Sequence, residues 1–396
     1  MFPRISRVII KNYKSIGRAS VEMRPLTIFI GPNGAGKSNF IDALEFVKDC
    51  IENPVESALR ERGGFDAVRR NSISHPTNIT VGLKIIIDEE READYVFSIK
   101  SEKNKLFKIS SELCTVREDF KEYKYEVKDG QFTKSIQGIS PSLIADRLAL
   151  QIASSIEPYR TVFGFLNSMR FYSIAPQEIR RLKEANTGTF LAKDGSNAAA
   201  VLKQIKASSH NGDCDYERIC RLLTHVVNDI KEISYKSIGK YETIIFKQDV
   251  GSRYPWEFDA LSMSDGTLRV LGILLALYQT GKHSLIAIEE PEATVHPAVT
   301  ELLVQVLKSA SENKQIILTT HSPEILDYKE ISEDDIRMVE SEKNNTIIAP
   351  LAESNKCAVR AKLCSLGDLH RIGELKADRL YWDKIKQSKL NLDSEV

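Results

Sequence analysis

A glycine-rich segment at residues 31–38 carries the residue types that bind a polyphosphate. It reads Gly-Pro-Asn-Gly-Ala-Gly-Lys-Ser and fits the pattern G-x-x-x-x-G-K-[S/T] between a buried apolar run and a helical pattern. Glycines let backbone N–H groups surround phosphate oxygens, and a helix N-terminus adds its positive dipole end. Lys37 is expected to reach the β- and γ-phosphates of ATP, and Ser38 to ligate Mg²⁺. The residues predicted to contact the nucleotide here are Asn33, Gly34, Ala35, Gly36, Lys37, Ser38 and Asn39.

Two adjacent carboxylates close a second apolar segment, Ser-Leu-Ile-Ala-Ile-Glu-Glu-Pro at residues 284–291. Parallel sheets bind their ligands at the carboxyl ends of the strands. Two adjacent acids at such an end therefore indicate a functional role. By position Glu289 is the acid on the metal side, directly or through water, and Glu290 is the base that polarises an attacking water. The alternative is a solvated strand end, where acids are common.

A third apolar segment, residues 315–319, runs into a polar stretch that contains His321. An imidazole at this place is expected to hydrogen-bond the γ-phosphate and to orient the water. A histidine with a purely structural role is the alternative. The preceding strand pattern and the order of the segments favour the catalytic assignment.

The segment Leu-Ser-Met-Ser-Asp-Gly-Thr-Leu at residues 261–268 precedes a long helical pattern. Taken alone, Ser-x-Gly before a helix is also an ordinary N-cap. In the company of the other segments, the hydroxyl of Ser264, the N–H of Gly266 and the helix dipole predict a second phosphate cradle. One chain does not always close both cradles on one nucleotide. We therefore expect a C2 dimer in which each Ser264 cradle covers the ATP of the other copy.

The elements that must position these residues follow from hydrophobic periodicity. A strand is predicted at residues 5–12, buried strands at 26–30, 285–288 and 315–319, and helices at 38–51, 261–278 and 297–309. Short β-branched or aromatic runs predict an antiparallel layer at residues 79–87, 94–99, 106–110 and 122–128. The chain is predicted to be mostly helical from 141 to about 235, to form strands at 243–247 and 256–258, and to end in a charged helical stretch over 366–396.

Bulk composition limits the class of protein. Lys+Arg and Asp+Glu both total 55, so the chain as a whole has no net charge to attract nucleic acid, although a local basic face is not excluded. The longest apolar run, residues 270–278, is about half of a bilayer span, and the N-terminus lacks a signal-peptide core. The six cysteines have no zinc-knuckle spacing and read as reduced structural thiols. We expect a cytoplasmic protein with no membrane partner.

In their order along the chain, these segments resemble the ABC-type ATPase heads of the SMC, RecF and OLD group. The resemblance covers roughly residues 1–60 and 255–345. Its further motifs are Asn-Tyr-Lys-Ser at 12–15, Glu-Glu-Pro-Glu at 289–292 with His296-Pro297, Arg-Gly-Gly-Phe at 62–65, and Ser-Asp-Gly-Thr at 264–267. The motif at 289–292 with His296-Pro297 is similar to the OLD-like branch, and the last two motifs are most similar to the compact bacterial ATPases of that branch. The implied fold is α/β: an ABC-type P-loop head with a mixed sheet, an antiparallel β-layer and an inserted helical lobe.

The resemblance also implies roles and boundaries. Ser264 and Gly266 correspond to the signature segment, Glu290 and His321 to the hydrolytic residues, and Gln177 is the candidate Q-loop residue that would join Ser38 and Glu289 near the metal. The stretch after His321 is too short for the nuclease domain of full OLD proteins, and no long coiled coil is present. The expected regions are an N-terminal ATPase lobe (1–140), a mainly helical insertion (141–255), a C-terminal ATPase lobe (256–350) and a helical tail (351–396).

Three functions stay open on this basis. The first is an ATP-hydrolysing dimeric switch that controls DNA or a separately encoded effector protein, as in bacterial defence against phage. The second is a RecF-like ATPase that clamps DNA during repair. The third is a scaffold that binds ATP and hydrolyses it slowly. Assemblies larger than a dimer are compatible with each of them.

Overall fold

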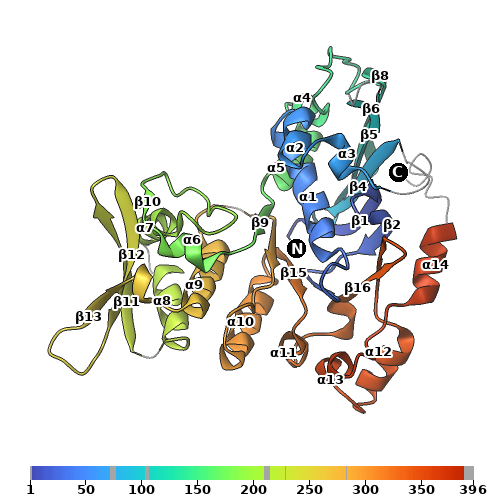
Figure 1. Ribbon diagram of the computed structural model, residues 1–396. Helices are drawn as coiled ribbons and strands as arrows, with labels where there is room; N and C mark the ends of the chain where they lie inside the picture. The colour runs from blue at the N-terminus through green and yellow to red at the C-terminus, as the bar shows by residue number, and fades with distance from the viewer. Residues whose placement is uncertain are drawn as a thin grey trace.

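A central, mostly parallel sheet brings the apolar segments side by side in the computed structural model, which describes residues 2–71, 77–102, 107–208, 215–227, 229–281 and 283–387. The six-stranded sheet has the order β17-β16-β3-β15-β14-β9 and lies near the middle of Figure 1. All its pairs are parallel except β16 with β17. The strands are β3 (Leu26–Ile30), β9 (Arg170–Tyr172), β14 (Leu285–Glu289), β15 (Gln315–Thr320), β16 (Ile336–Glu342) and β17 (Asn345–Ala349).

The second sheet is antiparallel and forms the upper right of Figure 1. It has seven strands in the order β2-β1-β4-β5-β6-β7-β8. Neighbours along the chain pair as hairpins except at β1–β4, where the chain returns after forming β3 and α1. The strands are β1 (Arg4–Tyr13), β2 (Ile16–Glu22), β4 (Asn78–Ile86), β5 (Arg91–Ser101), β6 (Phe107–Glu118), β7 (Lys121–Lys128) and β8 (Gln131–Lys134).

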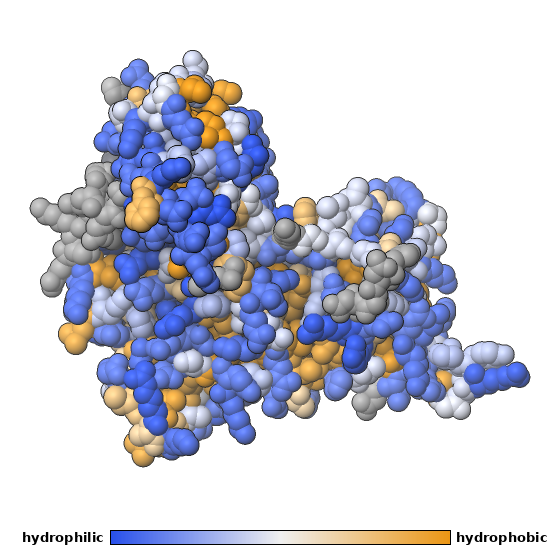
Figure 2. Space-filling view, turned by 180° about the vertical axis from the view of Figure 1, so that it is seen from behind, coloured by the Kyte–Doolittle hydropathy of each residue, from blue (hydrophilic) through white to orange (hydrophobic). Residues whose placement is uncertain are grey.

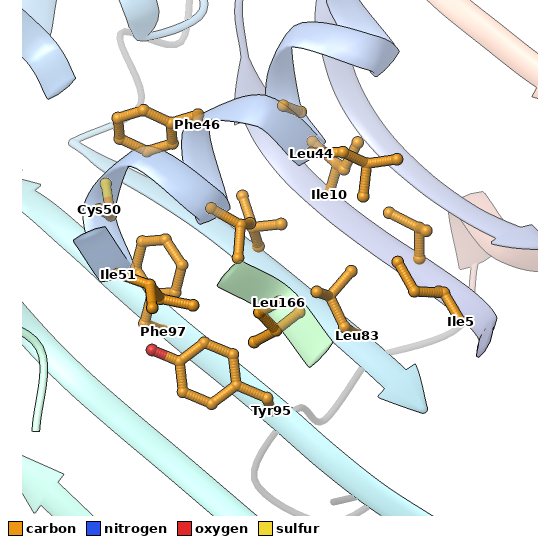
Figure 3. Packing of buried hydrophobic residues seen from close by; sticks show 14 of the residues in the cluster. Ile5, Ile10, Leu44, Phe46, Cys50, Ile51, Leu83, Tyr95, Phe97 and Leu166 are labelled. Carbon is orange, nitrogen blue, oxygen red and sulfur yellow. The ribbon is translucent and has the colours of Figure 1, made fainter. Parts of the chain in front are cut away.

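Helix α1 (Lys37–Glu52) joins the two sheets. Its buried residues recur at helical spacing and include Phe40, Leu44, Val47 and Ile51. Figure 3 shows Leu44, Phe46 and Ile51 facing side chains from β1, β4 and β5, together with Leu166. The six-stranded sheet is buried on both faces: Phe29 and Ala287 belong to this core, whereas their neighbours Ile28 and Ile288 belong to the core on the other face. Burial on both faces explains why these strands are continuous apolar runs rather than alternating ones.

The other core continues into an arm at the left of Figure 1. A four-stranded antiparallel sheet lies there, in which β12 pairs with β10, β11 and β13. Its strands are β10 (Lys183–Glu184), β11 (Ile230–Ile238), β12 (Tyr241–Gln248) and β13 (Trp256–Asp259). Helix α9 (Asp265–Tyr278), buried along most of its length, contacts both this arm and β14 and so links the arm to the central sheet.

The remaining helices cover the edges and ends of the sheets. They are α2 (Val55–Glu61), α3 (Phe65–Val68), α4 (Leu150–Ala153), α5 (Glu157–Asn167), α6 (Pro176–Arg180), α7 (Ala198–Ser208), α8 (Asp215–Thr224), α10 (Pro297–Ala310), α11 (Pro323–Leu326), α12 (Glu353–Arg360), α13 (Leu366–Arg371) and α14 (Arg379–Gln387). Short 3-10 turns lie at Ala260–Ser262 and Glu333–Asp335. Figure 2 shows, from behind, a surface that is mainly hydrophilic with small separate apolar patches. Within the described ranges, no helix combines the length and the apolar character that crossing a membrane requires.

Most elements predicted from periodicity are present, with corrections at several places. The helix predicted from residue 261 begins at Asp265, after a 3-10 turn, because Ser264 caps it. The region predicted as mostly helical, 141–235, contains α4 to α8 but also supplies β9, β10 and the start of β11. The strands β2, β16 and β17 were not predicted. Residues 388–396 of the predicted helical tail, and residue 106 of a predicted strand, lie outside the described residues.

Candidate functional site

The residues singled out in the sequence meet at the carboxyl edge of three adjacent strands. Strand β15 lies between β3 and β14 and is parallel to both. The register pairs Glu289 with Thr319 on one side, and Thr320 with Ile30 on the other. Because all three strands end at the same level, the glycine-rich segment, the paired carboxylates and His321 emerge at one edge of the sheet. This edge is where open α/β sheets bind their ligands.

The glycine-rich loop is held by close backbone approaches. A Cβ on Gly31 would overlap the carbonyl oxygen of Val339 in the neighbouring strand β16. Gly36 has φ 111° and precedes the first turn of α1, and a Cβ there would overlap the side chain of Thr346. Only glycine adopts that φ without strain. Both glycines are therefore required by the loop's own geometry, and the first turn of α1 is left without a side-chain cap.

The ammonium of Lys37 lies in the centre of the loop. The side chain is 6% exposed, and its Nζ donates to the carbonyl oxygens of Gly31 at 2.6 Å and Pro32 at 3.1 Å. Burial lowers the pKa of Lys37, and the nearby charges of Glu290, Glu292 and Glu289 partly offset this lowering. A positive charge that lies among backbone dipoles and forms no direct ion pair with the described residues is suited to bind phosphate.

Ser38 and Glu289 form the donor set expected for Mg²⁺. The hydroxyl of Ser38 donates to Oε2 of Glu289 across 2.5 Å, which connects the first turn of α1 to the end of β14. Mg²⁺ in phosphate-binding sites is held by one or two protein oxygens together with phosphate oxygens and waters. A hydroxyl and a carboxylate at hydrogen-bond distance fit this requirement. The Glu at this position, one methylene longer than the usual Asp, still reaches Ser38.

Glu290 takes a backbone conformation unusual for its residue type. Its φ is 44°, in the left-handed region, and its N–H donates to the carbonyl oxygen of Thr319 at 3.0 Å. Such a conformation costs of order 1–3 kcal/mol and persists only where the surroundings impose it. It leaves one carboxylate oxygen 3.6 Å from Nδ1 of His321, with both side chains partly exposed to solvent. The predicted base and the predicted orienting histidine are therefore neighbours.

Glu292 is a third carboxylate at this edge, and its role was not predicted from the sequence. The residue is 9% exposed, and its Oε1 accepts a hydrogen bond from the hydroxyl of Thr320 at 2.6 Å. Its Oε2 is buried and has no hydrogen-bond partner among the described residues. Burial raises the pKa of Glu292, against the hydrogen bond from Thr320 and the proximity of His321. A buried carboxylate beside the paired acids makes Glu292 a further candidate residue of this site.

A hydrogen-bond network behind the loop includes Ser15 and Thr346, which were not predicted as site residues. The hydroxyl of Thr346 donates to the carbonyl oxygen of Ala35 at 2.9 Å and lies 2.6 Å from the hydroxyl of Ser15. The side-chain amide of Asn39 donates to the same Ser15 hydroxyl at 2.6 Å. In this structure the Asn39 side chain thus supports the loop from behind, and its contact with a nucleotide stays a prediction. Ser15 was visible in the Asn-Tyr-Lys-Ser motif, whereas Thr346 had no sequence signal.

The Ser264 segment lies against the stretch that follows the paired acids. Ser264 is exposed, and its Oγ accepts a hydrogen bond from the N–H of Thr267 at 3.2 Å. This is the ordinary N-cap arrangement, the alternative to a phosphate cradle. A Cβ on Gly266 would lie 2.8 Å from the carbonyl oxygen of Thr294. Further along α9, Nη1 of Arg269 reaches the carbonyl oxygen of Glu290 at 3.4 Å. The N-terminus of α9 is therefore fixed relative to the acids, with its cap accessible from outside.

Gln177 lies in α6 and is connected to the Ser264 segment through Arg180. Its Oε1 accepts from Nη1 of Arg180 at 2.8 Å, and Nη2 of Arg180 donates to the carbonyl oxygen of Met263 at 2.9 Å. The same nitrogen donates to a carboxylate oxygen of Asp265 at 2.5 Å. The structure thus brings Gln177 to the start of α9, while Ser38 and Glu289 form a separate pair. Its role at the metal stays a prediction.

Three parallel strands that present a P-loop, paired acids and a histidine at one edge define a P-loop ATPase head of the ABC type. The fold agrees with the solved Smc head domain from Pyrococcus furiosus, at a TM-score of 0.55 and 10% identity over 91% of this chain and 100% of that one. Residues 26–327 match the family described as "AAA domain, putative AbiEii toxin, Type IV TA system", and the chain belongs to this family.

Two curated relatives resemble most of the chain. The "Old nuclease" of Escherichia phage P2 is 23% identical over 363 residues, which are 83% of this chain and 58% of that protein. The "ATP/GTP phosphatase" of Helicobacter pylori is 20% identical over 340 residues, 82% of this chain and 86% of that protein. The chain therefore spans little more than half the length of the first of these relatives. These likenesses confirm the SMC, RecF and OLD-like grouping and the ABC-type head.

Proposed function

We propose that this protein binds and hydrolyses ATP at the edge formed by β3, β15 and β14. Lys37 and the N–H groups from Asn33 to Asn39 bind the phosphates. Ser38 and Glu289 hold Mg²⁺, which, when bound, neutralises the phosphate charge. Glu290 accepts the proton of the attacking water, and His321 orients that water and the γ-phosphate. The printed name of the phosphatase relative supports a hydrolytic activity.

The observation that carries this proposal is the pair formed by Glu290 and His321. Their side chains approach to 3.6 Å beside the Ser38–Glu289 pair, from the ends of two adjacent strands. The left-handed backbone of Glu290 sets the carboxylate in this place. Strain of this kind concentrates at functional sites. The same side chain on a relaxed strand end would favour the solvated alternative.

The test is the Glu290→Gln variant, which keeps the shape and removes the base. We expect ATP binding to remain and turnover to fall by about 10²–10⁴-fold, the usual contribution of a positioned base. Glu324→Gln is the matched control, because Glu324 is an exposed acid near His321 in sequence and lies outside the proposed site. Wild-type turnover in the Glu290 variant would remove this residue from the base position. Equal losses in both variants would point to a general electrostatic effect.

A second copy is proposed to complete the site. Ser264 and Gly266 stand at the accessible N-terminus of α9, where a partner's γ-phosphate would meet N–H groups and the helix dipole. In this arrangement ATP closes the dimer and hydrolysis opens it, and Gln177 relays the metal site to α9. Sedimentation of Glu290→Gln with and without ATP tests the arrangement. ATP-dependent dimers that disappear in Ser264→Arg support it, whereas an ATP-loaded monomer contradicts it.

The ATP-dependent switch is proposed to act on DNA or on a separate effector protein, in defence against phage. The family description, which names a toxin and a TA system, and the nuclease relative support such a setting. A short DNA duplex titrated against the protein at several salt concentrations, with and without ATP, separates the two targets. Binding that tightens with ATP and weakens with salt favours DNA and a clamp. Binding that is absent or indifferent to ATP favours the effector.

A further inference from the structure

A cavity of about 440 Å³ is lined by none of the residues placed at the proposed ATP site. Its walls come from the start of β2, the residues after α3, the β16–β17 turn and α14. The lining includes Arg18, Arg70, Lys343, Asn345 and Trp382. Three cationic side chains therefore line one hollow that the proposed ATP site does not use.

The two arginines of this cavity have no anionic partner among the described residues. Both are half-buried, and the Nε of Arg18 and the Nε of Arg70 are buried without a hydrogen-bond acceptor. Across the described part of the chain, neither guanidinium forms an ion pair, and burial lowers the pKa of Arg18. These half-buried guanidiniums therefore offer unpaired N–H donors to a ligand that supplies negative oxygen atoms.

The charge around the cavity is positive on balance. Its one acid, Glu342, is exposed, and its Oε2 accepts from Nη1 of Arg379 at 2.9 Å. Lys11 stands opposite Arg18 in the β1–β2 register, and directly paired residues of antiparallel strands share a face. Like charges in this arrangement repel each other.

The backbone is arranged to admit Arg70. A Cβ on Gly17 would lie 2.5 Å from Nη1 of Arg70, so the guanidinium occupies the space that a side chain at this position would fill. The N–H of Gly17 donates to Oδ1 of Asn345 at 3.0 Å and fixes the opposite wall. The N–H of Arg70 donates to the carbonyl oxygen of Asn12 at 2.9 Å. The backbone of Arg70 is thus held in position at the cavity.

We propose that this cavity is a second phosphate-binding site, separate from the P-loop, in which Arg18 and Arg70 bind the oxygens of one phosphate group. A guanidinium presents a planar fork of donors that matches a phosphate in a bidentate manner. The phosphate belongs either to a small phosphorylated molecule or to a nucleic-acid backbone. Both sources present the same oxygens to the arginines, and the size of the cavity accommodates more than a bare phosphate.

Trp382 provides a reporter for this site, because it lines the cavity and the chain has only one other tryptophan, Trp256. The test protein carries Trp256→Phe, which leaves Trp382 as the single fluorophore, and Lys37→Ala, which disables the P-loop. It is titrated with inorganic pyrophosphate and, separately, with a short blunt DNA duplex. We expect saturable binding that weakens about tenfold or more when Arg18→Gln or Arg70→Gln is added.

Further variants distinguish a loss of phosphate binding from a loss of the folded structure. Gly17→Ala removes no charge but displaces Arg70, and is expected to weaken binding as well. Arg160→Gln is the matched control, since Arg160 is an exposed arginine paired with Glu157 outside the cavity. Each variant is compared with its parent by thermal melting.

The two titrations identify the source of the phosphate. Binding of pyrophosphate alone assigns the site to small phosphorylated molecules, and competition by the duplex assigns it to nucleic acid. Either outcome supports the site. Binding that ignores Arg18 and Arg70, or acetate competing as well as pyrophosphate, overturns it. Because the P-loop is disabled throughout, the outcome is independent of ATP hydrolysis.

Discussion

Arg180 donates a hydrogen bond to Asp265 across 2.5 Å and so connects α6 to the first turn of α9. The other terminal nitrogen of Arg180 binds the amide oxygen of Gln177 at 2.8 Å. One half-buried guanidinium therefore joins the predicted Q-loop residue to the helix that carries Ser264 and Gly266. Movement of Gln177 would be transmitted to the start of α9 through this side chain.

Substitution of Arg180 is expected to uncouple the two segments. We predict that Arg180→Gln binds ATP as tightly as the wild type but turns it over about ten to a hundred times more slowly, the effect of losing a charged hydrogen bond worth about 1.5–3 kcal/mol. Steady-state ATPase rates and direct nucleotide binding measure the two quantities separately. Arg181→Gln is the matched control, because Arg181 is exposed and pairs only with Glu178 among the described residues. Equal effects of both substitutions would contradict the assignment.

The Ser38–Glu289 pair predicts a specific metal dependence. Ser38→Ala removes the hydroxyl that donates to Glu289, and with it one of two protein oxygens placed for Mg²⁺. We expect ATP binding in the presence of excess Mg²⁺ to weaken about tenfold, while binding measured with a chelator changes little. A fluorescent ATP analogue titrated under both conditions measures this difference. Identical losses with and without Mg²⁺ would show that the hydroxyl acts on the nucleotide alone.

Alanine substitutions at the two glycines of the loop that have positive φ should lower the stability of the protein by different amounts. Gly36→Ala combines strain at φ 111° with overlap against Thr346, whereas Gly34→Ala has φ 76° and nothing within 4 Å of the added Cβ. We expect Gly36→Ala to lower the free energy of unfolding by about 1–3 kcal/mol more than Gly34→Ala does, the usual cost of overpacking. Denaturant unfolding of the protein without nucleotide measures both. Similar costs would mean that Thr346 moves aside freely.

His283 predicts a pH dependence of stability unrelated to the ATP site. The residue is 7% exposed; its pKa is lowered to about 4 by burial, with Arg170 and Lys314 adding to the effect. Between about pH 4 and its ordinary value near 6.5, the unfolded chain binds a proton that the folded chain does not. The free energy of unfolding should therefore fall as the pH drops through this window. His283→Leu should flatten that slope, and exposed His225→Gln should leave it unchanged. An unchanged slope in both variants would assign it to other groups.

The sequence was most informative at positions where the chemistry requires one particular type of residue. The P-loop, the two carboxylates and His321 each follow an apolar run, and the parallel order of β3, β15 and β14 places them at one edge. The antiparallel layer was predicted from its short β-branched or aromatic runs. The strands β16 and β17 escaped because their ends are polar and their pairing with β3 is a long-range contact that no local pattern reports.

The candidate site residues could thus be predicted from the residue types and from their spacing along the chain. Which groups support them was decided only by the fold. Glu292 became a buried acid because Thr320 of the neighbouring strand meets it, and Thr346 became the support of Gly36 because the β16–β17 hairpin returns beneath the loop. The cationic cavity of Arg18 and Arg70 joins residues 17–18, 70 and 343–345 in the same way. Proximity between distant segments arises from packing, and local sequence does not encode it.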